Sequence, residues 1–126
     1  MNRFVKTLLI LLVAAPGMAM AEMCPAPDSA PAVPDGSTAT KEEMVHAQSE
    51  IHSYLRNAQQ YVDCVDENED VGKIEIIHMD EDDRKARIRE LNAARHHRNA
   101  VVESMQKLAK DFNTEIEKYQ ARQGGS

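Results

Sequence analysis

Apolar residues recur every three or four positions between residues 44 and 119 of this 126-residue chain, the spacing of one face of an α-helix. In the first half these residues are Met44, Ala47, Ile51, Tyr54, Leu55, Ala58, Tyr61, Val62 and Val65. In the second half one heptad frame holds Ile88, Leu91, Val102, Met105, Ala109, Phe112, Ile116 and Tyr119, with Arg95 and Arg98 in its two other core positions. Two such faces of similar length bury each other, so the sequence predicts an all-α fold over residues 40–121: a long antiparallel two-helix hairpin, coiled-coil-like.

The ends of the two helices carry their own signals. Thr40 and Glu43 form a capping box at the start of the first helix. The acidic run 80–83 suits the N-terminus of the second helix. Gly72 can stop the first helix, but Ile76 and Met79 continue its apolar face, so we expect the turn near 78–82, within the window 66–83. Residues 122–126 end in Gly-Gly-Ser and are predicted to form a disordered tail.

The first 21 residues have the organisation of a secretory signal peptide. Arg3 and Lys6 give a positive start, residues 7–15 are apolar, and Ala19-Met20-Ala21 fits the A-x-A cleavage pattern. Cleavage after Ala21 leaves 105 residues with no apolar stretch near the ~20 residues that span a bilayer. Residues 21–23 do not form a lipidation signal before the following cysteine. We therefore expect a periplasmic or secreted protein without stable membrane insertion.

Residues 22–39 are predicted to form an extended, proline-rich arm. Four prolines exclude a helix and favour a polyproline-like path: Pro25, Pro27, Pro31 and Pro34. Asp35-Gly36 is a turn signal. The alternative is a disordered N-terminal tail.

The only two cysteines, Cys24 and Cys64, are predicted to form a disulfide because export leads to an oxidising compartment. Cys64 lies about 36 Å along a helix from Thr40. The 16 residues from Cys24 to Thr40 reach at most about 50 Å in polyproline form, so the arm can fold back to Cys64. The alternative is that the two cysteines are unpaired or bonded to another molecule.

Charge and composition limit the partners. The leader carries no acidic residue, so the mature chain holds 13 basic against 21 acidic residues, a net charge of −8. Such a chain is a poor nucleic-acid binder, because phosphates need clustered Lys and Arg. Aromatic residues make up 4% and Trp is absent, which favours a slender assembly over a broad core. Exposed apolar faces of two helices favour self-association, as a four-helix bundle or coiled coil, or another envelope protein as partner.

No catalytic motif is present: the sequence lacks a nucleophile elbow, a glycine-rich phosphate loop, HExxH and CxxC. A two-helix hairpin is also expected to lack a concave pocket in which pKa values shift. We therefore predict no enzyme, no catalytic residue and no cofactor.

Two groups of side chains are weaker site candidates. Arg95, His96, His97 and Arg98 form a basic patch, a candidate contact for an anion or partner, or a solvated face that pairs with acids of the first helix. Adjacent helical residues point about 100° apart, so the two histidines do not suit a metal. The weak metal candidates are Glu42, His46 and Glu50, spaced four residues apart, although any charged helix face has this pattern. The acidic run 63–70 lacks the EF-hand spacing. No metal site is predicted.

Several motifs together resemble a family of small uncharacterised secreted proteins from proteobacteria. They are C-P-x-P at 24–27, P-D-G-S-T-A-T-K-E-E-M at 34–44, two tyrosines before the cysteine at 54–64, R-N-A-V-V-E-S-M at 98–105 and F-N-T-E-I-E-K-Y at 112–119. The resemblance implies a helical hairpin with an N-terminal Cys-Pro arm and supplies no activity. We predict a non-enzymatic interaction or structural module of the bacterial envelope. The alternative is a periplasmic stress chaperone or metal-sensing helical protein.

Overall fold

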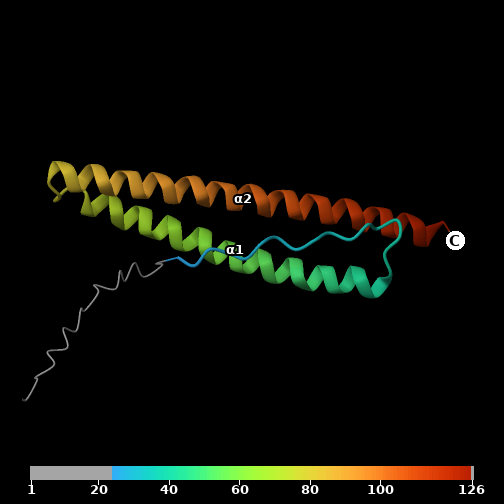
Figure 1. Ribbon diagram of the computed structural model, residues 1–126. Helices are drawn as coiled ribbons and strands as arrows, with labels where there is room; N and C mark the ends of the chain where they lie inside the picture. The colour runs from blue at the N-terminus through green and yellow to red at the C-terminus, as the bar shows by residue number, and fades with distance from the viewer. Residues whose placement is uncertain (1–23, 126) are drawn as a thin grey trace, which may run out of the picture.

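The computed structural model describes residues 24–125, which form two long antiparallel helices (Figure 1). Helix α1 spans Lys41–Glu75 and helix α2 spans Glu81–Gly124. They are about 52 and 66 Å long at 1.5 Å per residue. The predicted hairpin is confirmed, and α2 continues three residues beyond its expected end at residue 121. The signal peptide prediction, residues 22 and 23 of the arm, and residue 126 lie outside the described residues.

The start of α1 is fixed by the predicted capping box. The Thr40 side-chain oxygen accepts a hydrogen bond from the Glu43 amide at 3.2 Å, and the Glu43 carboxylate accepts one from the Thr40 amide at 2.7 Å. The helix then passes through Gly72, as expected from the continuing apolar face. A Cβ atom at Gly72 would lie 2.8 Å from the Leu91 side chain, so this glycine allows α2 to approach closely.

The turn between the helices lies inside the predicted window and is held by short polar contacts. The Asp80 carboxylate accepts hydrogen bonds from the amides of Asp82 and Asp83, at 3.1 and 3.0 Å, and caps α2. The Arg84 guanidinium donates to the carbonyl oxygens of Ile76 and Met79, at 3.2 and 3.0 Å. These bonds satisfy backbone groups at the ends of both helices and close the hairpin within five residues.

The core is built mainly from α1. The buried apolar residues of α1 match the predicted face and are Met44, Ala47, Ile51, Tyr54, Ala58, Tyr61, Val62 and Val65. Helix α2 buries only Val101, Leu108 and Phe112. The predicted frame of α2 is therefore partly wrong, since it omitted Val101 and Leu108, and Ile88 is 38% exposed.

The face that α2 turns toward α1 is rotated from the predicted frame, because α2 meets the tyrosines of α1 through His97 and Ser104. Residues 24–34 carry no helix or strand and run beside the hairpin from Cys24 back toward Thr40 (Figure 1). Val101 and Leu108 share a face with Ser104 and His97, which contact α1 on the arm side. The predicted core positions on the opposite edge, such as Val102, are only half-buried.

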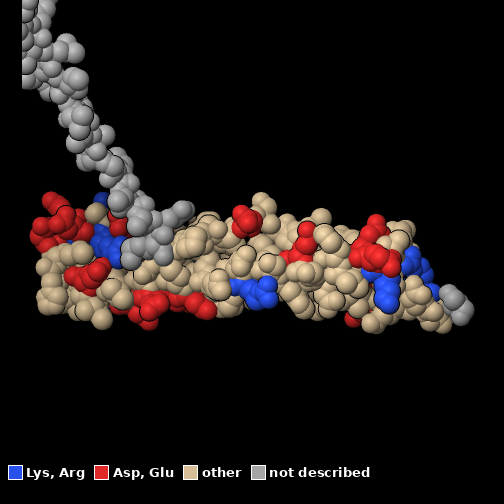
Figure 2. All heavy atoms as spheres, turned by 90° about the horizontal axis from the view of Figure 1, so that it is seen from below, with Lys and Arg blue, Asp and Glu red and all other residues tan. Residues whose placement is uncertain are grey.

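Charge is unevenly spread over the surface. Acidic side chains gather at the end of the molecule that carries the turn, and fewer charges lie along the middle of the face seen in Figure 2. Of the helices in the described part, neither is both long and apolar enough to cross a membrane. The surface also exposes several branched apolar side chains: Val45, Val71, Ile74, Ile77 and Ile88.

Candidate functional site

The most structured feature outside the core is the arm edge, the side of the hairpin along which residues 24–39 lie. The arm ends in a turn in which the Asp35 carbonyl accepts from the amides of Thr38 and Ala39, at 3.1 and 2.8 Å. The Asp35 carboxylate accepts from the amide and hydroxyl of Ser37, and these bonds lower the pKa of Asp35. The turn signal at Asp35-Gly36 is thus confirmed, and the turn places the arm directly before the cap of α1.

The turn of the arm is fastened to the C-terminal part of α2. The Gly36 amide donates to the Glu115 carboxylate at 2.8 Å. The Arg122 guanidinium donates to the carbonyl oxygens of Ser37, at 3.2 Å, and Ala39, and it lies 5.1 Å from the centre of the Tyr119 ring. Hydrogen bonds from Lys118 and from Gly36 hold the pKa of Glu115 below its ordinary value. A residue expected in a disordered tail, Arg122, therefore closes this contact.

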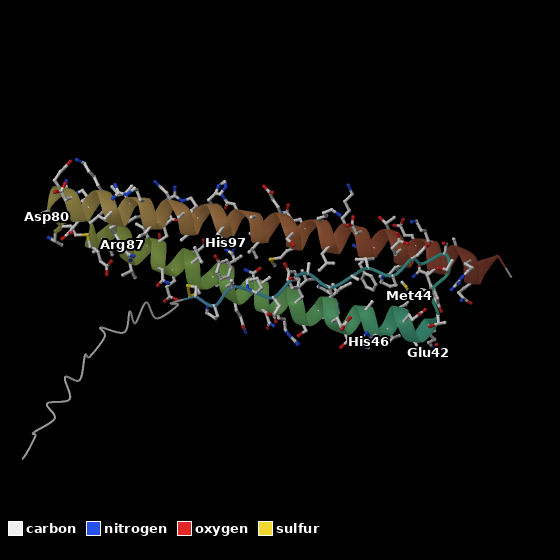
Figure 3. All side chains as sticks on the ribbon, viewed as in Figure 1. Glu42, Met44, His46, Asp80, Arg87 and His97 are labelled. Carbon is white, nitrogen blue, oxygen red and sulfur yellow. A yellow bond between two sulfur atoms is a disulfide. The ribbon has the colours of Figure 1, made fainter. Side chains whose placement is uncertain are left out.

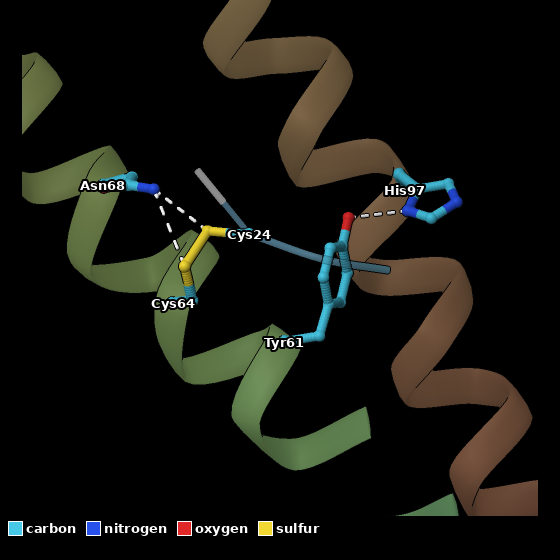
Figure 4. Close-up of a disulfide and its surroundings, with 5 residues drawn as sticks. All are labelled: Cys24, Tyr61, Cys64, Asn68 and His97. Carbon is cyan, nitrogen blue, oxygen red and sulfur yellow. Dashed lines mark hydrogen bonds between the residues drawn. A yellow bond between two sulfur atoms is a disulfide. The ribbon is translucent and has the colours of Figure 1, made fainter. Parts of the chain in front are cut away.

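The other end of the arm is fastened by the predicted disulfide, which is present. Cys24 and Cys64 are bonded with a Cα–Cα distance of 5.7 Å. The Asn68 side-chain amide donates toward both sulfurs, at 3.0 Å to Cys24 and 3.8 Å to Cys64 (Figure 4). Asn68 lies one turn after Cys64 on α1, so the helix itself positions the amide beside the disulfide.

A cavity of about 240 Å³ lies next to the disulfide, between the two helices. Its apolar wall includes Val65 and Leu91, and its polar wall includes Asn68 and Arg87, with Cys24 at one end. The buried Nε atom of Arg87 has no hydrogen-bond acceptor among the described residues. A bare hairpin was expected to lack a concave pocket. The arm forms part of the wall, so the hollow depends on a contact that the helical pattern does not predict.

Two tyrosines of α1 reach across to α2 on the arm edge. The Tyr61 hydroxyl lies 2.6 Å from His97 Nδ1, with the two rings edge to face at 87° (Figure 4). The Tyr54 hydroxyl lies 3.1 Å from the Ser104 hydroxyl. Burial raises the pKa of Tyr61, so its hydroxyl stays protonated at neutral pH. His97 therefore contacts Tyr61 of α1, although its side chain, like that of His96, is exposed.

On the opposite edge, the two arginines of the predicted basic patch pair with acids of α1. Arg95 makes two hydrogen bonds to the Glu69 carboxylate, at 3.1 and 2.7 Å. Arg98 makes two to the Asp66 carboxylate, at 2.9 and 2.8 Å. Such two-pronged pairs fix the angle between the helices as well as the charge balance. Of the interpretations given for the patch, pairing with α1 is the one seen here. A contact with an anion or partner remains a prediction.

Because Glu69 is paired with Arg95, we expect the protein to lose part of its stability in acid. Hydrogen bonds from Arg95, and next from Lys73, hold the pKa of Glu69 at about 2. Because this folded-state pKa lies below the ordinary value, the stabilisation is present above about pH 4.5 and is lost as the pH falls toward 2. Solvent screens the pair, so the effect is at most about 1 kcal/mol. In thermal melts between pH 5 and pH 2, Glu69→Gln should show a shallower fall in melting temperature than the native chain.

The control for this measurement is Glu67→Gln, which changes an exposed acid on the same helix. It should keep the native slope. Equal slopes for all three proteins would show that the Glu69–Arg95 pair contributes nothing to stability in solution.

The weak metal candidates lie at the start of α1, at the opposite end of the hairpin from Asp80 and Arg87 (Figure 3). His46 Nδ1 is 3.4 Å from the Glu50 carboxylate, and both side chains are more than half exposed. Among residues 24–125, no group of three or more His, Cys, Asp or Glu side chains is placed to hold a metal ion. Glu42, His46 and Glu50 therefore do not form a metal-binding group in this structure.

No known family model, curated protein or solved structure matches this chain. The resemblance carried by its sequence motifs therefore remains a prediction. The disulfide is typical of proteins that mature in an oxidising compartment.

Proposed function

We propose that this chain is an exported, non-enzymatic helical interaction module of the bacterial envelope, periplasmic or secreted, that associates with a second copy of itself. The leader-like residues 1–21 and the disulfide support export. Hairpins of this kind act by presenting long helical faces.

The observation that carries the proposal is the thin core of α2. This helix has 44 residues and buries only three of them. Its remaining apolar residues, including Val102, Met105 and Ile116, are half-buried along the edge of the core. A long helix with so little burial gains stability when another apolar surface covers its free edge.

The uncovered surface is the open groove, a hollow of about 300 Å³ between the start of α1 and the end of α2. Met44, Val45, Phe112, Ile116 and Tyr119 provide its apolar lining. Its rim holds Lys41, Gln48 and Gln120, so a single charged residue lines it. The arm occupies the other edge and is fastened there at both ends. The open groove is therefore available to an external partner at the end of the hairpin away from the turn.

A second copy is the partner that this surface fits best. Two hairpins related by a two-fold axis would each supply the same apolar patch, with Lys41 as the single charged rim residue of each copy. The result is a four-helix bundle, in which Ile116 and the other apolar residues of the open groove become core. The two acid–arginine pairs lie nearer the turn and would flank this contact.

The test measures the mass of the purified protein by light scattering. It compares lysine substitutions at two exposed aliphatic residues. Val45→Lys changes a side chain that is 56% exposed in the open groove. Ile74→Lys changes one that is 65% exposed near the turn and serves as the matched control. We expect twice the monomer mass for the native chain and for Ile74→Lys, and the monomer mass for Val45→Lys. A monomeric native chain at all concentrations would refute self-association.

A further inference from the structure

We propose that the Cys24–Cys64 disulfide is a thiol-exchange site, at which a dithiol oxidoreductase reduces the bond and releases the arm from the hairpin. The inference rests on how the arm is attached, on access to the Cys24 sulfur and on the position of the Asn68 amide. It does not depend on self-association.

The arm is attached at its two ends and loosely between them. At one end the disulfide joins it to α1. At the other end Glu115 and Arg122 bind the turn at 36–39. Within the described part of the chain, no hydrogen bond links residues 25–34 to either helix. Its middle lies beside shallow hollows lined by Asn57 and Gln60 of α1. Breaking the disulfide therefore removes the covalent attachment of residues 24–34 and leaves the packing of Val33 against the core.

A thiol can approach the disulfide from the cavity next to it. Cys24 lines this cavity of about 240 Å³, whereas Cys64 does not. Both cysteines are only half-buried. Attack by an external thiolate on Cys24 Sγ forms a mixed disulfide with Cys24 and breaks the bond to Cys64, whose sulfur leaves as a thiolate. The second thiol of the reductant then attacks the mixed disulfide, so that Cys24 leaves as a thiolate and the reductant becomes a disulfide. Both thiolates take up protons from water.

Asn68 lies near both leaving sulfurs: it is closer to Cys24 Sγ, which leaves in the second step, than to Cys64 Sγ, which leaves in the first. Its side-chain amide lies 3.0 Å from Cys24 Sγ and 3.8 Å from Cys64 Sγ. A hydrogen bond to a neutral disulfide sulfur is weak, and it strengthens as negative charge develops on that sulfur. An interaction that is stronger in the transition state than in the ground state increases the rate. The helix holds Asn68 one turn after Cys64, so the amide can follow that sulfur as the bond breaks.

The charges around the cavity indicate which reductant fits. Glu69 and Glu90 line the cavity wall, and their negative charges repel a reductant that carries acidic groups beside its thiols. Arg87 provides the nearby positive charge. A neutral dithiol, or a dithiol protein without acidic residues around its thiols, meets the least repulsion. Once the disulfide is open, the arm can move away from the face of α1 that carries Tyr61. That face lies beside the arm in the oxidised protein.

The experiment measures the rate at which dithiothreitol reduces the disulfide, followed by trapping of free thiols and mass spectrometry. Asn68→Leu removes the donors at similar size, and Asn68→Asp replaces them with a negative charge at nearly the same shape. We expect reduction to be about tenfold slower for Asn68→Leu, the effect of one lost hydrogen bond in the transition state, and slower still for Asn68→Asp. Asn113→Leu, at an exposed site on α2, is the matched control and should react like the native chain.

A second measurement follows the arm by limited proteolysis of the oxidised and reduced native protein. Reduction should speed cleavage within residues 24–34 and leave the turn at 36–39 uncut. Circular dichroism before each assay confirms that the variants are folded. Rates for both Asn68 variants within twofold of the native rate would overturn the role of Asn68. An arm that is cleaved at the same rate in both redox states would overturn its release.

Discussion

Replacing Cys64 with serine should lower the melting temperature by ten degrees or more in air. The disulfide closes a loop of 40 residues, which restricts the unfolded chain and contributes up to about 4 kcal/mol. For a domain of about 100 residues, each 1 kcal/mol shifts the melting temperature by about 4 °C or more. The effect is large here because the core is thin, with twelve buried apolar residues shared between two helices and one end of the arm. Thermal melts followed by circular dichroism measure it.

Three comparisons make this result specific. The native chain in excess dithiothreitol should have the same melting temperature as Cys64→Ser. Cys24→Ser should also melt at that temperature. Dithiothreitol should leave the melting temperature of Cys64→Ser unchanged. If all of these proteins melt at the native temperature, the arm is not a structural part of the domain.

The parts of this fold that follow from the sequence are those set by local chemistry. The apolar face of α1 needs only helical spacing, and the Thr40 cap needs only a partner three residues away. The pairing of Cys24 with Cys64 follows from there being two cysteines in a chain whose first residues predict export. Each of these features involves residues that are close in sequence or have a single available partner, so pattern and composition identify them.

The register of α2 and the attachment of the arm do not follow from such patterns. A heptad frame assumes that one helix packs against another and nothing else. Here α2 also holds the turn of the arm, and its edge with His97 and Ser104 faces α1, so Val101 and Leu108 are buried and Ile88 is not. The contacts of Glu115 and Arg122 with the arm span about 80 residues of sequence. Asn68 differs from these residues. It follows Cys64 by four residues, so helical spacing is enough to place it beside that cysteine.

The close approach of the arm to α2 yields the second large effect, a loss of stability of about 2–3 kcal/mol in Gly36→Ala. Gly36 is buried, and an added Cβ would lie 1.8 Å from the Glu115 carbonyl oxygen and 3.0 Å from the Tyr119 amide nitrogen. Both atoms belong to the backbone of α2, which cannot move aside as the end of a side chain can. The turn must therefore lift away, and the hydrogen bonds to Gly36, Ser37 and Ala39 break. Melts at neutral pH measure the loss.

Gly124→Ala is the control for Gly36→Ala, because a Cβ atom there meets no atom within 4 Å. The stability of Gly124→Ala should equal that of the native chain or exceed it slightly, since alanine restricts the unfolded chain more than glycine does. The backbone of Gly36 has no positive φ, so any destabilisation of Gly36→Ala comes from lack of space. With the disulfide intact, limited proteolysis of Gly36→Ala should become faster at 36–39 and stay slow near Cys24. This pattern is opposite to that expected after reduction, because the two ends of the arm are attached independently. Native stability in Gly36→Ala would mean that the turn does not rest on α2.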